Sequence, residues 1–526
     1  AFTFVTAGAA GATLTNVEQI NLQAGSTAAV IASNTANLIV NNTHATNAAT
    51  VTLGTGAGQT FIGSGSGANA VTLGGAGQFL TGGTGGDTFT TSHANAVGST
   101  FAGGAGADTL AINNAGTTLN LSAAQLNSIE TLTLTGATTI TVNPTAALAI
   151  TGGAGATSIT GATAQTLTVT QGAAQTLALA GLANYAVSGG TTGAITSTGT
   201  GSLTVAASAN NQTVTSASAT TINAAALGAA NTETLDGTGA YTVTGLGTIS
   251  TSVITEAATR AGTLSITTAA AANNATVTEV AGATGAVTIT DALTGVLTLT
   301  AVSSHASTTV SLTGATGTLL GAAGSTAGVT ATSTAGAHLF NFTAGTTSVV
   351  DTMTGFTGAD SYVGGLGADI ITTGGGADVI NLIATTDTSV ASGFAFNTAV
   401  PANLQTVNTT GMDVVNGFSA GCTVQLGTAI NAAGAVTAIT SGTSLVRNGG
   451  TLGAAAGTAG DAALITGDYI STTGLFTVNT GGTSSLFVYY DNGTTAAGSY
   501  HGIVLVGYID TGAVDTYAAT GLFTAV

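Results

Sequence analysis

Apolar and polar residues alternate with a period of two along much of the chain. Between Ile112 and Thr343 the alternation recurs in short runs of Thr with Val, Leu or Ile, such as TLTVT, SLTVA, AVTIT and LTLTAV. Such alternation is typical of half-buried β-strands, and the Gly, Ala and Asn residues between the runs indicate turns. We predict an all-β protein with little helix, whose strands stack as an elongated parallel β-helix or β-solenoid. A set of separate β-sandwiches is the alternative architecture.

A period of nine residues replaces this alternation from Gly355 to Asn381. The three units there read GFTGADSYV, GGLGADIIT and TGGGADVIN, and their eighth positions are large residues that we expect to face inward. The eighth positions of the three units are Tyr362, Ile371 and Ile380, and the eighth position of the unit before them is Met353. The sixth positions are aspartates, and the frame extends to one further aspartate on each side. The five aspartates are Asp351, Asp360, Asp369, Asp378 and Asp387.

The units match the repeat G-G-x-G-x-D-x-U-x, which is typical of a calcium-bound parallel β-roll. Glycines permit the tight turn, and the Asp side chain supplies a hard oxygen ligand. Because two units make one coil, we expect Asp351, Asp369 and Asp387 to stack on one edge, and Asp360 and Asp378 on the other. Such rows of like charge repel one another unless a cation lies between the turns. A surface loop rich in Gly and Asp is the alternative.

A second nine-residue frame runs from Thr55 to Thr90 and carries fewer acids. Its units are TGAGQTFIG, SGSGANAVT, LGGAGQFLT and GGTGGDTFT, with eighth positions Ile62, Val71, Leu80 and Phe89. Their sixth positions are Thr60, Asn69, Gln78 and Asp87. Twelve extra residues, 91–102, precede GGAGADTLA with its Asp108. If this insert replaces half a coil, Asp108 stacks beside Asp87, with Asn69 one coil further, and we expect one calcium site between Asp87 and Asp108.

These patterns divide the chain into five regions. We predict an N-terminal β-strand region at 1–54, a first β-roll at 55–111, a Thr/Ala/Gly-rich β-solenoid at 112–345, a second β-roll at 346–390 and a C-terminal β-domain at 391–526. The last region contains the long apolar strands LFVYYD (Leu486 to Asp491) and GIVLVGYID (Gly502 to Asp510). We expect them to form a β-cap, because a solenoid needs an end unit of different composition.

The charge balance narrows the possible partners. The chain of 526 residues has 20 Asp and Glu residues against two bases, Arg260 and Arg447, and a net charge of -18. We expect no nucleic-acid partner, and divalent cations are favoured instead. We also expect no membrane insertion, because Thr, Gly and Asn interrupt every apolar stretch before 18 residues. The single Cys422 cannot form an internal disulfide.

Three similar segments each place a glutamate just before an expected strand. They are NVEQINL, SIETLTL and NTETLDG, with Glu18, Glu130 and Glu233. One interpretation is further calcium ligation at the coil edges. The other, which we favour, is a turn acid that accepts backbone N–H groups at the start of a strand.

The catalytic motifs of secreted hydrolases are weak or missing, so we predict that the protein is not an enzyme. There is no H-E-x-x-H, and the five histidines have no ligand spacing, which is more typical of polar surface residues. One G-x-S-x-G occurs at Gly417–Gly421, and Asp468 and Asp491 precede His501 in the order of a hydrolase. The nucleophile elbow needs a following helix, however, and the strand-like CTVQLG directly follows Gly421. We therefore interpret the motif as a turn that closes the second roll.

The nonapeptides at 364–381 and 82–90 resemble those of the RTX (repeats-in-toxin) proteins exported by type I secretion. The Thr/Ala/Gly-rich strands, the Glu-bearing turns and the acidic balance resemble the calcium-dependent, Caulobacter-type surface-layer proteins of Gram-negative bacteria. LFVYYDNG and GIVLVGY are similar to the C-terminal secretion-signal region of RTX proteins. The resemblance implies several Ca²⁺ ions bound by the roll aspartates, by Asn69 and by the turns that precede them. The turn residues are Gly364, Leu366, Gly82, Thr84, Gly103 and Ala105.

The resemblance also implies a function at the cell surface. We expect a structural protein that assembles with copies of itself into a calcium-dependent two-dimensional lattice after secretion. Lipopolysaccharide or another surface glycan is an expected further partner, although no N-terminal helical anchor of the kind found in that family is visible. The alternative is a secreted RTX adhesin or matrix protein that binds carbohydrate or a surface.

Overall fold

The computed structural model of the chain is almost entirely β-structure. It describes residues 2–4, 17–23, 29–30, 36–113, 118–122, 125–136, 138–153, 157–172, 175–189, 193–207, 211–280, 282–300, 307–321, 328–342, 350–382, 406–409, 412–426, 439–442, 446–447, 450–451, 462–479, 481–491, 499–509, 516–518 and 522–525. The helix α1 (His93–Ala96) is four residues long and is the one helix in these ranges. The predicted all-β class is confirmed. The chain divides into two units, Ala1–Thr242 and Val243–Val526; the five predicted regions stay a prediction.

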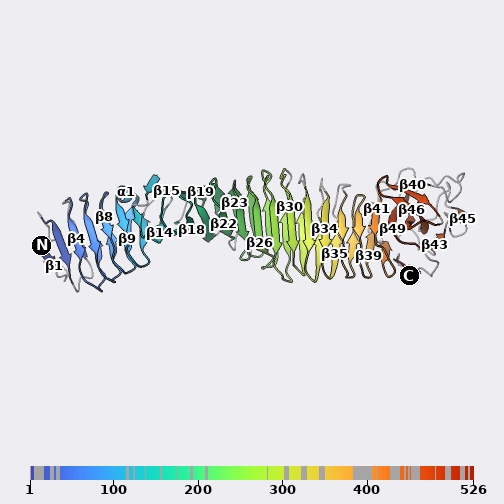
Figure 1. Cartoon of the computed structure of the whole chain (residues 1–526), viewed down its shortest axis with the longest axis horizontal. Helices are drawn as coiled ribbons and strands as arrows, with labels where there is room; N and C mark the ends of the chain where they lie inside the picture. Colours follow the sequence, from blue (N-terminus) through green and yellow to red (C-terminus); the bar gives the residue numbers. More distant parts are fainter. Residues whose placement is uncertain are drawn as a thin grey trace. The chain divides into compact units, whose positions relative to one another are not determined.

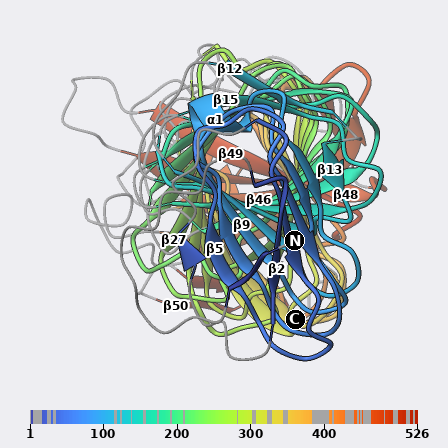
Figure 2. The ribbon, with the colours of Figure 1, turned by 90° about the vertical axis from the view of Figure 1, so that its left-hand side faces the viewer.

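The first unit is a parallel β-solenoid in which every coil contributes two strands. Strands that alternate along the chain pair in parallel and in register, so that Val51 stacks on Val71 and Val71 on Phe89. One sheet contains β1 (Phe2–Phe4), β2 (Gln19–Leu22), β4 (Ile39–Asn42), β6 (Thr60–Gly63), β8 (Phe79–Thr81), β10 (Thr100–Ala102) and β13 (Leu126–Asn127). Figure 2 views this unit from the end that carries β1 and shows its coils superposed around a common interior.

Two further sheets complete the first unit. One contains β3 (Ala29–Val30), β5 (Thr50–Thr52), β7 (Ala70–Thr72), β9 (Thr88–Ser92), β11 (Thr109–Asn113), β14 (Thr131–Leu134), β16 (Leu148–Thr151), β18 (Thr166–Gln171), β20 (Asn184–Gly189), β22 (Leu203–Ala206) and β24 (Thr220–Asn223). The other contains β12 (Thr118–Leu121), β15 (Thr138–Val142), β17 (Thr157–Gly161), β19 (Leu177–Gly181), β21 (Ala194–Ser197), β23 (Gln212–Ser216) and β25 (Thr232–Asp236). The strand β26 (Tyr241–Leu246) contains the boundary between the units.

The interior of the first unit consists of columns of stacked apolar side chains. Every second residue of a strand faces inward, as the alternation in the sequence predicted, and inward residues of neighbouring coils are register partners. One such column is Leu132, Ile150, Val169, Val187, Val205 and Ile222, each at most 3% exposed. Complete burial of a side chain of this size contributes about 1.5–3 kcal/mol, so these columns are the main stabilising feature of the coils.

The insert at 91–102 replaces half a coil, as predicted. It forms the end of β9, then α1, then β10, and β11 returns to stack directly on β9 with Leu110 over Phe89. The predicted frame was wrong by one residue in its first unit, residues 55–63. There Phe61 is buried and pairs with Leu80, while Ile62 is 36% exposed, and Gln59 occupies the position assigned to Thr60. The reason is one extra residue before Asn69, so that Asn69 follows Gln59 by ten positions and not by nine.

The second unit repeats this architecture with two parallel sheets, visible as the regularly spaced strands from β30 to β39 in Figure 1. One sheet contains β28 (Leu264–Thr268), β30 (Val287–Asp291), β32 (Thr308–Leu312), β34 (Val329–Ser333), β36 (Thr352–Thr354), β38 (Ile370–Thr372) and β41 (Asp413–Asn416). The other contains β27 (Ser252–Glu256), β29 (Ala275–Thr278), β31 (Val296–Thr300), β33 (Thr316–Leu320), β35 (Ala337–Asn341), β37 (Ser361–Val363), β39 (Val379–Leu382) and β42 (Thr423–Leu426).

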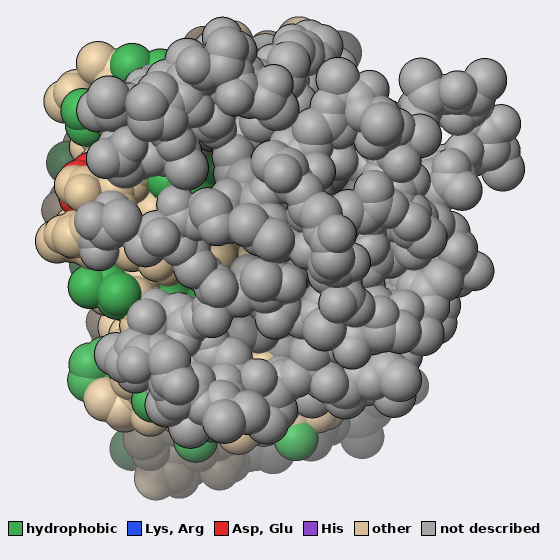
Figure 3. All heavy atoms as spheres, turned by 90° about the vertical axis from the view of Figure 1, so that its right-hand side faces the viewer, with side chains coloured by type: hydrophobic (Ala, Val, Ile, Leu, Met, Phe, Trp, Pro, Cys, Tyr) green, Lys and Arg blue, Asp and Glu red, His purple; other side chains and the backbone are tan. Residues whose placement is uncertain are grey.

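The second unit ends in antiparallel structure, which confirms the predicted C-terminal β-cap. The strands β46 (Ala462–Ile470), β47 (Leu475–Val478), β48 (Ser484–Asp491) and β49 (Ser499–Val506) pair as antiparallel neighbours, and β49 also pairs in parallel with β41. Smaller strands are β40 (Thr406–Asn408), β43 (Ile439–Gly442), β44 (Val446–Arg447), β45 (Gly450–Thr451), β50 (Thr516–Ala518) and β51 (Leu522–Thr524). Among the described atoms in Figure 3, hydrophobic and uncharged atoms predominate at this end.

Candidate metal centre: the aspartate ladders

The nonapeptide aspartates of the second unit point into the solenoid and stack as predicted. The backbone N–H of Asp351 donates to Oδ1 of Asp369 at 2.8 Å, and Val329 N–H donates to Oδ1 of Asp351 at 2.7 Å. Next on this edge is Asp413, whose Oδ1 accepts the N–H of Asp369 at 2.9 Å. The predicted third member, Asp387, lies outside the described residues. We call this column the first-edge ladder.

Asp413 was missed as a ladder member because 44 residues separate it from Asp369. A signal for it exists in the sequence. Asp413-Val-Val415-Asn repeats the D-x-U-x half of the nonapeptide, and Val415 is fully buried on Ile371. A search for the half-motif alone would have found this coil.

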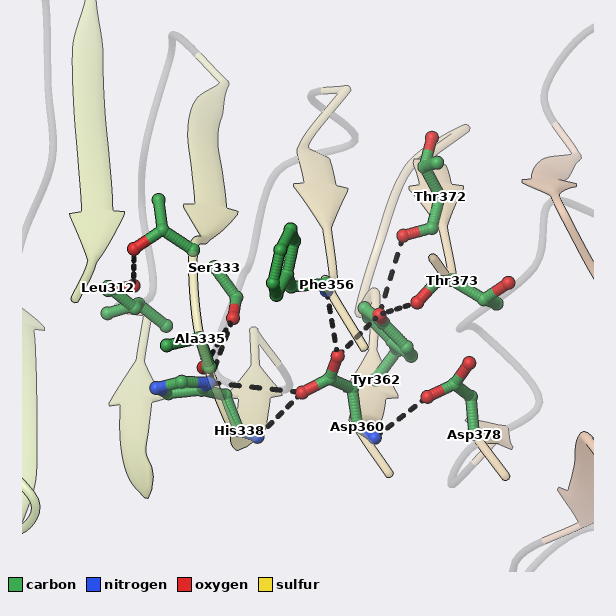
Figure 4. Close-up of polar contacts among 11 residues, drawn as sticks. Leu312, Ser333, Ala335, His338, Phe356, Asp360, Tyr362, Thr372, Thr373 and Asp378 are labelled. Carbon is green, nitrogen blue, oxygen red and sulfur yellow. Dashed lines mark hydrogen bonds and ion pairs between the residues drawn. The ribbon is translucent and has the colours of Figure 1, made fainter. Parts of the chain in front are cut away.

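The opposite edge of the second unit carries the second-edge ladder, drawn in Figure 4. The N–H of Asp360 donates to Oδ1 of Asp378 at 2.8 Å, and the N–H of His338 donates to Oδ1 of Asp360 at 2.6 Å. Cys422 occupies the following coil, with its Sγ 3.8 Å from Oδ2 of Asp378. The predicted pairing of Asp360 with Asp378 is thus observed, with His338 and Cys422 as neighbours that the nonapeptide frame did not include.

The first unit has a similar column, the N-terminal ladder, in the predicted order. The N–H of Asn69 donates to Oδ1 of Asp87 at 2.6 Å, and the N–H of Asp87 donates to Oδ1 of Asp108 at 2.7 Å. Glu130 continues the column, because its Oε2 accepts the N–H of Asp108 at 2.8 Å. Glu130 thus accepts a backbone N–H group, as in the interpretation that we favoured over calcium ligation.

The glycines of the repeat are required by these carboxylates and by the close stacking of the turns. A Cβ atom at the first glycine of a unit would overlap Oδ2 of the aspartate of the same unit, as at Gly364 with Asp369 and Gly103 with Asp108. In the turns before Asp108, Asp369 and Asp378 the glycines at the second and fourth positions have positive φ, for example +81° at Gly374 and +127° at Gly376. The repeat therefore encodes a turn that folds back over its own carboxylate.

The turns that hold the proposed carbonyl ligands stack directly on one another. Thr84 N–H donates to the carbonyl of Gly65 at 2.7 Å, and Ala105 N–H donates to that of Gly83 at 3.1 Å. Gly82 and Gly103 begin the turns before Asp87 and Asp108. In the second unit, Gly364 and Leu366 lie in the turn before Asp369, and the next turn stacks through a 2.5 Å bond from Gly375 N–H to the Phe356 carbonyl.

Burial makes the ladder carboxylates electrostatically costly. Asp351 is 7% exposed, and the other four aspartates discussed here are at most 1% exposed: Asp108, Asp360, Asp369 and Asp378. Desolvation by burial raises the pKa of Asp351 to about 6 and also raises the pKa values of Asp108, Asp360 and Asp378, while hydrogen bonds from backbone N–H groups oppose the shift. A carboxylate with a raised pKa is one whose charge is not fully compensated.

The basic residues do little to compensate these charges. His338 lies beside Asp360, with Nδ1 3.9 Å from Oδ1, but burial lowers the pKa of His338, which favours the neutral imidazole. Arg260 is fully buried and forms a 2.5 Å ion pair with Glu256 instead. His338 is only 3% exposed, so the prediction of polar surface histidines was wrong there. It packs beside Phe340, with ring centroids 6.4 Å apart, because both positions of β35 face inward.

The donor chemistry fits calcium, but the carboxylates do not converge on one point. Over the described ranges, no group of three or more His, Cys, Asp or Glu residues is placed to hold a metal ion. The ladder carboxylates and the Asn69 amide offer oxygens, which Ca²⁺ prefers, and Oδ2 of Asp108 is buried with no hydrogen-bond partner. A calcium site here would need backbone carbonyls of stacked turns, such as those of Gly82 and Gly103, to complete its shell.

Two other sequence predictions change in the structure. Glu233 is not a turn acid: it lies within β25, is fully buried, and its carboxylate accepts no hydrogen bond. Glu18, by contrast, is exposed just before β2. Ser419 of the G-x-S-x-G motif lies in the exposed turn between β41 and β42, and a strand rather than a helix follows it. The motif therefore has the strand-turn-strand geometry of a roll-closing turn and not that of a nucleophile elbow.

Comparison with known proteins gives no relative. No protein-family model, no curated protein and no solved structure matches the chain. In the part of the chain that is described, no helix is long and apolar enough to span a membrane.

Proposed function

We propose that the protein is a structural cell-surface protein that assembles with copies of itself into a calcium-dependent two-dimensional lattice after secretion. The observation that carries this proposal is the presence of three inward-facing columns of buried carboxylates, in which desolvation raises the pKa values of Asp108, Asp351, Asp360 and Asp378. A solenoid stabilised by apolar burial alone has no need for such columns, because neutral side chains fill the equivalent positions in other coils. The RTX-like nonapeptide that encodes them adds independent support.

The ladder residues would hold the ions in pairs across neighbouring coils. On the first edge these are Asp351 with Asp369 and Asp369 with Asp413; on the second edge they are Asp360 with Asp378. Calcium supplies positive charge and shared oxygen coordination between coils. Sites of this extracellular type bind with dissociation constants of about 0.1–1 mM, so the rolls would be weak in a calcium-poor cytosol and stable outside the cell. Binding to the folded state alone adds directly to its stability.

The composition suits a lattice whose copies meet through uncharged surfaces or shared cations. With a net charge of -18 and two basic residues, direct ion pairing between copies is limited. Like-charged copies repel at long range, and divalent cations remove that repulsion. Calcium would then act at two levels, inside the coils and between molecules.

The test separates these two levels. Purified protein is examined by circular dichroism and by electron microscopy with 5–10 mM Ca²⁺, on the order of ten times the expected dissociation constants, and then with EGTA. We expect loss of strand signal and of any ordered sheet on chelation. Asp378→Asn should weaken the calcium response, whereas the control Asp236→Asn, at an aspartate outside the ladders, should not. An unchanged strand signal in EGTA, or monomers in calcium at every concentration, would refute the proposal.

One observation favours the adhesin alternative. The outer face of the sheet from β28 to β36 carries a regular double row of hydroxyls, with no charged side chain at the paired outward positions. The rows are Ser265, Thr288, Thr309, Thr330 and Thr352, and Thr267, Thr290, Ser311, Thr332 and Thr354. A flat hydroxyl array suits a neutral glycan surface. Calcium-loaded monomers that bind a glycan, and lose it when Thr309 and Thr330 become Val, would support this function over a lattice.

A further inference from the structure

A chain of buried side-chain amides crosses the interior of the first unit. Gln175 Nε2 donates to Oγ1 of Thr157 at 2.5 Å, Gln171 Nε2 donates to the backbone carbonyl of Gln175, and Gln212 Nε2 donates to Oε1 of Gln171 at 2.7 Å. All four side chains are at most 4% exposed. Glu233 is the register partner of Gln212 on the next strand and is also fully buried.

The direction of this chain is fixed by one backbone group. The carbonyl of Gln175 can only accept, so the amide of Gln171 must present its Nε2 to it and its Oε1 to Gln212. Gln212 must then donate to Gln171, which turns its own Oε1 away from that bond. Reversing either amide would place two acceptors against each other, so the assignment of oxygen and nitrogen follows from the network.

The chain ends in a set of acceptors with no donor. Oε1 of Gln212 and both carboxylate oxygens of Glu233 are buried and accept no hydrogen bond. Register partners in a parallel sheet lie about 4.8 Å apart, within reach of two inward side chains. An ionised Glu233 would therefore place a negative charge and two unpartnered oxygens beside the unpartnered Oε1 of Gln212 in a buried interior, which is strongly unfavourable. A neutral carboxyl group instead has an O–H to donate.

We propose that Glu233 is a neutral carboxylic acid in the folded protein, and that its O–H donates to Oε1 of Gln212 and completes the amide chain. The proton is then a structural component of these coils, and alkaline solution removes it. Desolvation by burial, which raises the pKa of Glu233 to about 8, is in agreement. This inference concerns a site separate from the aspartate ladders and holds whether or not calcium binds there.

Other titratable groups near this site do not replace the proton. The strand β23, which neighbours β25 in its sheet, and the strand β24, which precedes β25 in the chain, carry none. Asp236 on β25 has its Oδ1 engaged by the N–H of Gly237 at 2.6 Å, and Tyr241 donates its O–H to the carbonyl of Val214 at 3.0 Å. In the following coil, Glu256 and Arg260 are paired with each other.

The sign of the pH effect follows from the two states. In an opened coil the pKa of this carboxyl group is near its ordinary value of 4.5, whereas desolvation by burial raises its pKa to about 8 in the closed coil. Between these values the closed state holds one proton more than the open state, so opening becomes about tenfold more favourable per pH unit. Below pH 4.5 and above pH 8 this group adds no further pH dependence.

The first measurement is hydrogen exchange of β23 and β25 amides in the calcium-loaded full chain, compared with Glu233→Gln at the same pH. Glutamine keeps a donor for Gln212 and cannot ionise. We expect the ratio of opening constants, native over variant, to rise about 100-fold from pH 5 to pH 7. The matched control Glu18→Gln, at an exposed glutamate, should behave like the native protein. A ratio independent of pH would overturn the proposal.

The second measurement reports the proton directly and does not depend on stability. The infrared difference spectrum between native protein and Glu233→Gln at pH 6.5 should contain the carbonyl stretch of one carboxylic acid, lost above pH 9. If Glu233→Gln does not fold, Glu233→Met serves as the reference. A carboxylate band in place of the acid band would overturn the proposal, and a carboxylate band that shifts on chelation would assign a bound cation there instead.

Discussion

Two regions of the molecule solve the same problem, a polar side chain inside a narrow solenoid, with different chemistry. In the coils from Asp351 to Leu382 a carboxylate accepts the N–H of the preceding coil, and the pattern repeats every 18 residues. In the coils from Thr157 to Gln212 amides and hydroxyls bond to one another. The amides are neutral and form hydrogen bonds with one another. The carboxylates accept backbone N–H groups, but their charges are buried, and this is why we propose a cation between the coils.

The difference also appears in how regular the coils are. Within the nonapeptide runs the ladder residues lie 18 residues apart, as from Asp351 to Asp369, but the ladders continue across longer intervals, such as the 21 residues from Asp87 to Asp108. The amide coils vary in length, since Gln side chains can reach donors and acceptors in several directions. Regular spacing therefore follows the nonapeptide, and a carboxylate can join a ladder without it.

The largest expected effect tests the turn geometry of the aspartate coils. Gly376→Ala adds a Cβ where φ is +127° and where the carbonyl of Gly358 leaves no room. We expect a loss of about 3 kcal/mol or more in unfolding free energy, from strain and overlap together. Gly77→Ala is the matched control, since Gly77 has φ of +68° but open space at Cβ. It should cost about 1–2 kcal/mol. Equal losses in chemical denaturation would show that stacking of the turns is unimportant.

The next effect separates hydrogen bonding from metal binding. Asp87 accepts bonds at both carboxylate oxygens, from Asn69 N–H at 2.6 Å and from Gly83 N–H at 2.7 Å. Asp378 accepts one backbone bond, at 2.8 Å, and faces the weakly polar Sγ of Cys422. In EGTA, Asp87→Asn should cost about 1–3 kcal/mol, because one N–H then meets an NH₂ group, and Asp378→Asn should cost less.

In calcium, both variants should be less stable relative to the native protein than they are in EGTA. At ten times the dissociation constant, binding stabilises the native protein by about 1.4 kcal/mol per site, which either substitution would lose. Calcium titrations followed by denaturation give both numbers. If Asp378→Asn gains as much from calcium as the native protein, the second-edge ladder is only a hydrogen-bonding device.

The smallest expected effect comes from replacing an amide of a ladder with a carboxylate. Asn69 is an amide within the N-terminal ladder, and its Nδ2 donates to Oδ1 of Asp87 at 2.9 Å. Asn69→Asp replaces this bond with two facing carboxylates, so we expect a loss of about 1 kcal/mol in EGTA. Calcium should reverse part of the loss and raise the number of bound ions by up to one. A loss that is the same with and without calcium, measured by denaturation and calorimetry, would contradict a metal-binding role for this edge.

The sequence predicted the fold well because the signal is periodic. Alternation of period two located the inward columns, and the nonapeptide located the stacked pairs Asp87 with Asp108 and Asp360 with Asp378. A single extra residue ahead of Asn69 was enough to misplace Ile62, because a strand has only two faces and a shift of one exchanges them.

The interior polar residues were harder to predict because their partners are far away in the sequence or are residues of another type. Asp413 lies far along the chain from Asp369, and His338 and Cys422 join a ladder without being part of the repeat. Glu233 resembles Glu18 and Glu130 in its local sequence, but its inward position depends on the register of β25 with β23. Local sequence does not encode that register.

The hydrogen bonds of all three ladders run in one sense. The N–H of each coil reaches the carboxylate of the coil that follows it in the chain, from Asn69 to Glu130 and from Val329 to Asp413. A polypeptide that winds up from its C-terminal end would thus always offer a finished acceptor to the next coil. One that winds from its N-terminal end would carry an exposed donor at its growing tip. The columns therefore give each ladder a direction, and the two ends of a partly wound ladder differ in chemistry.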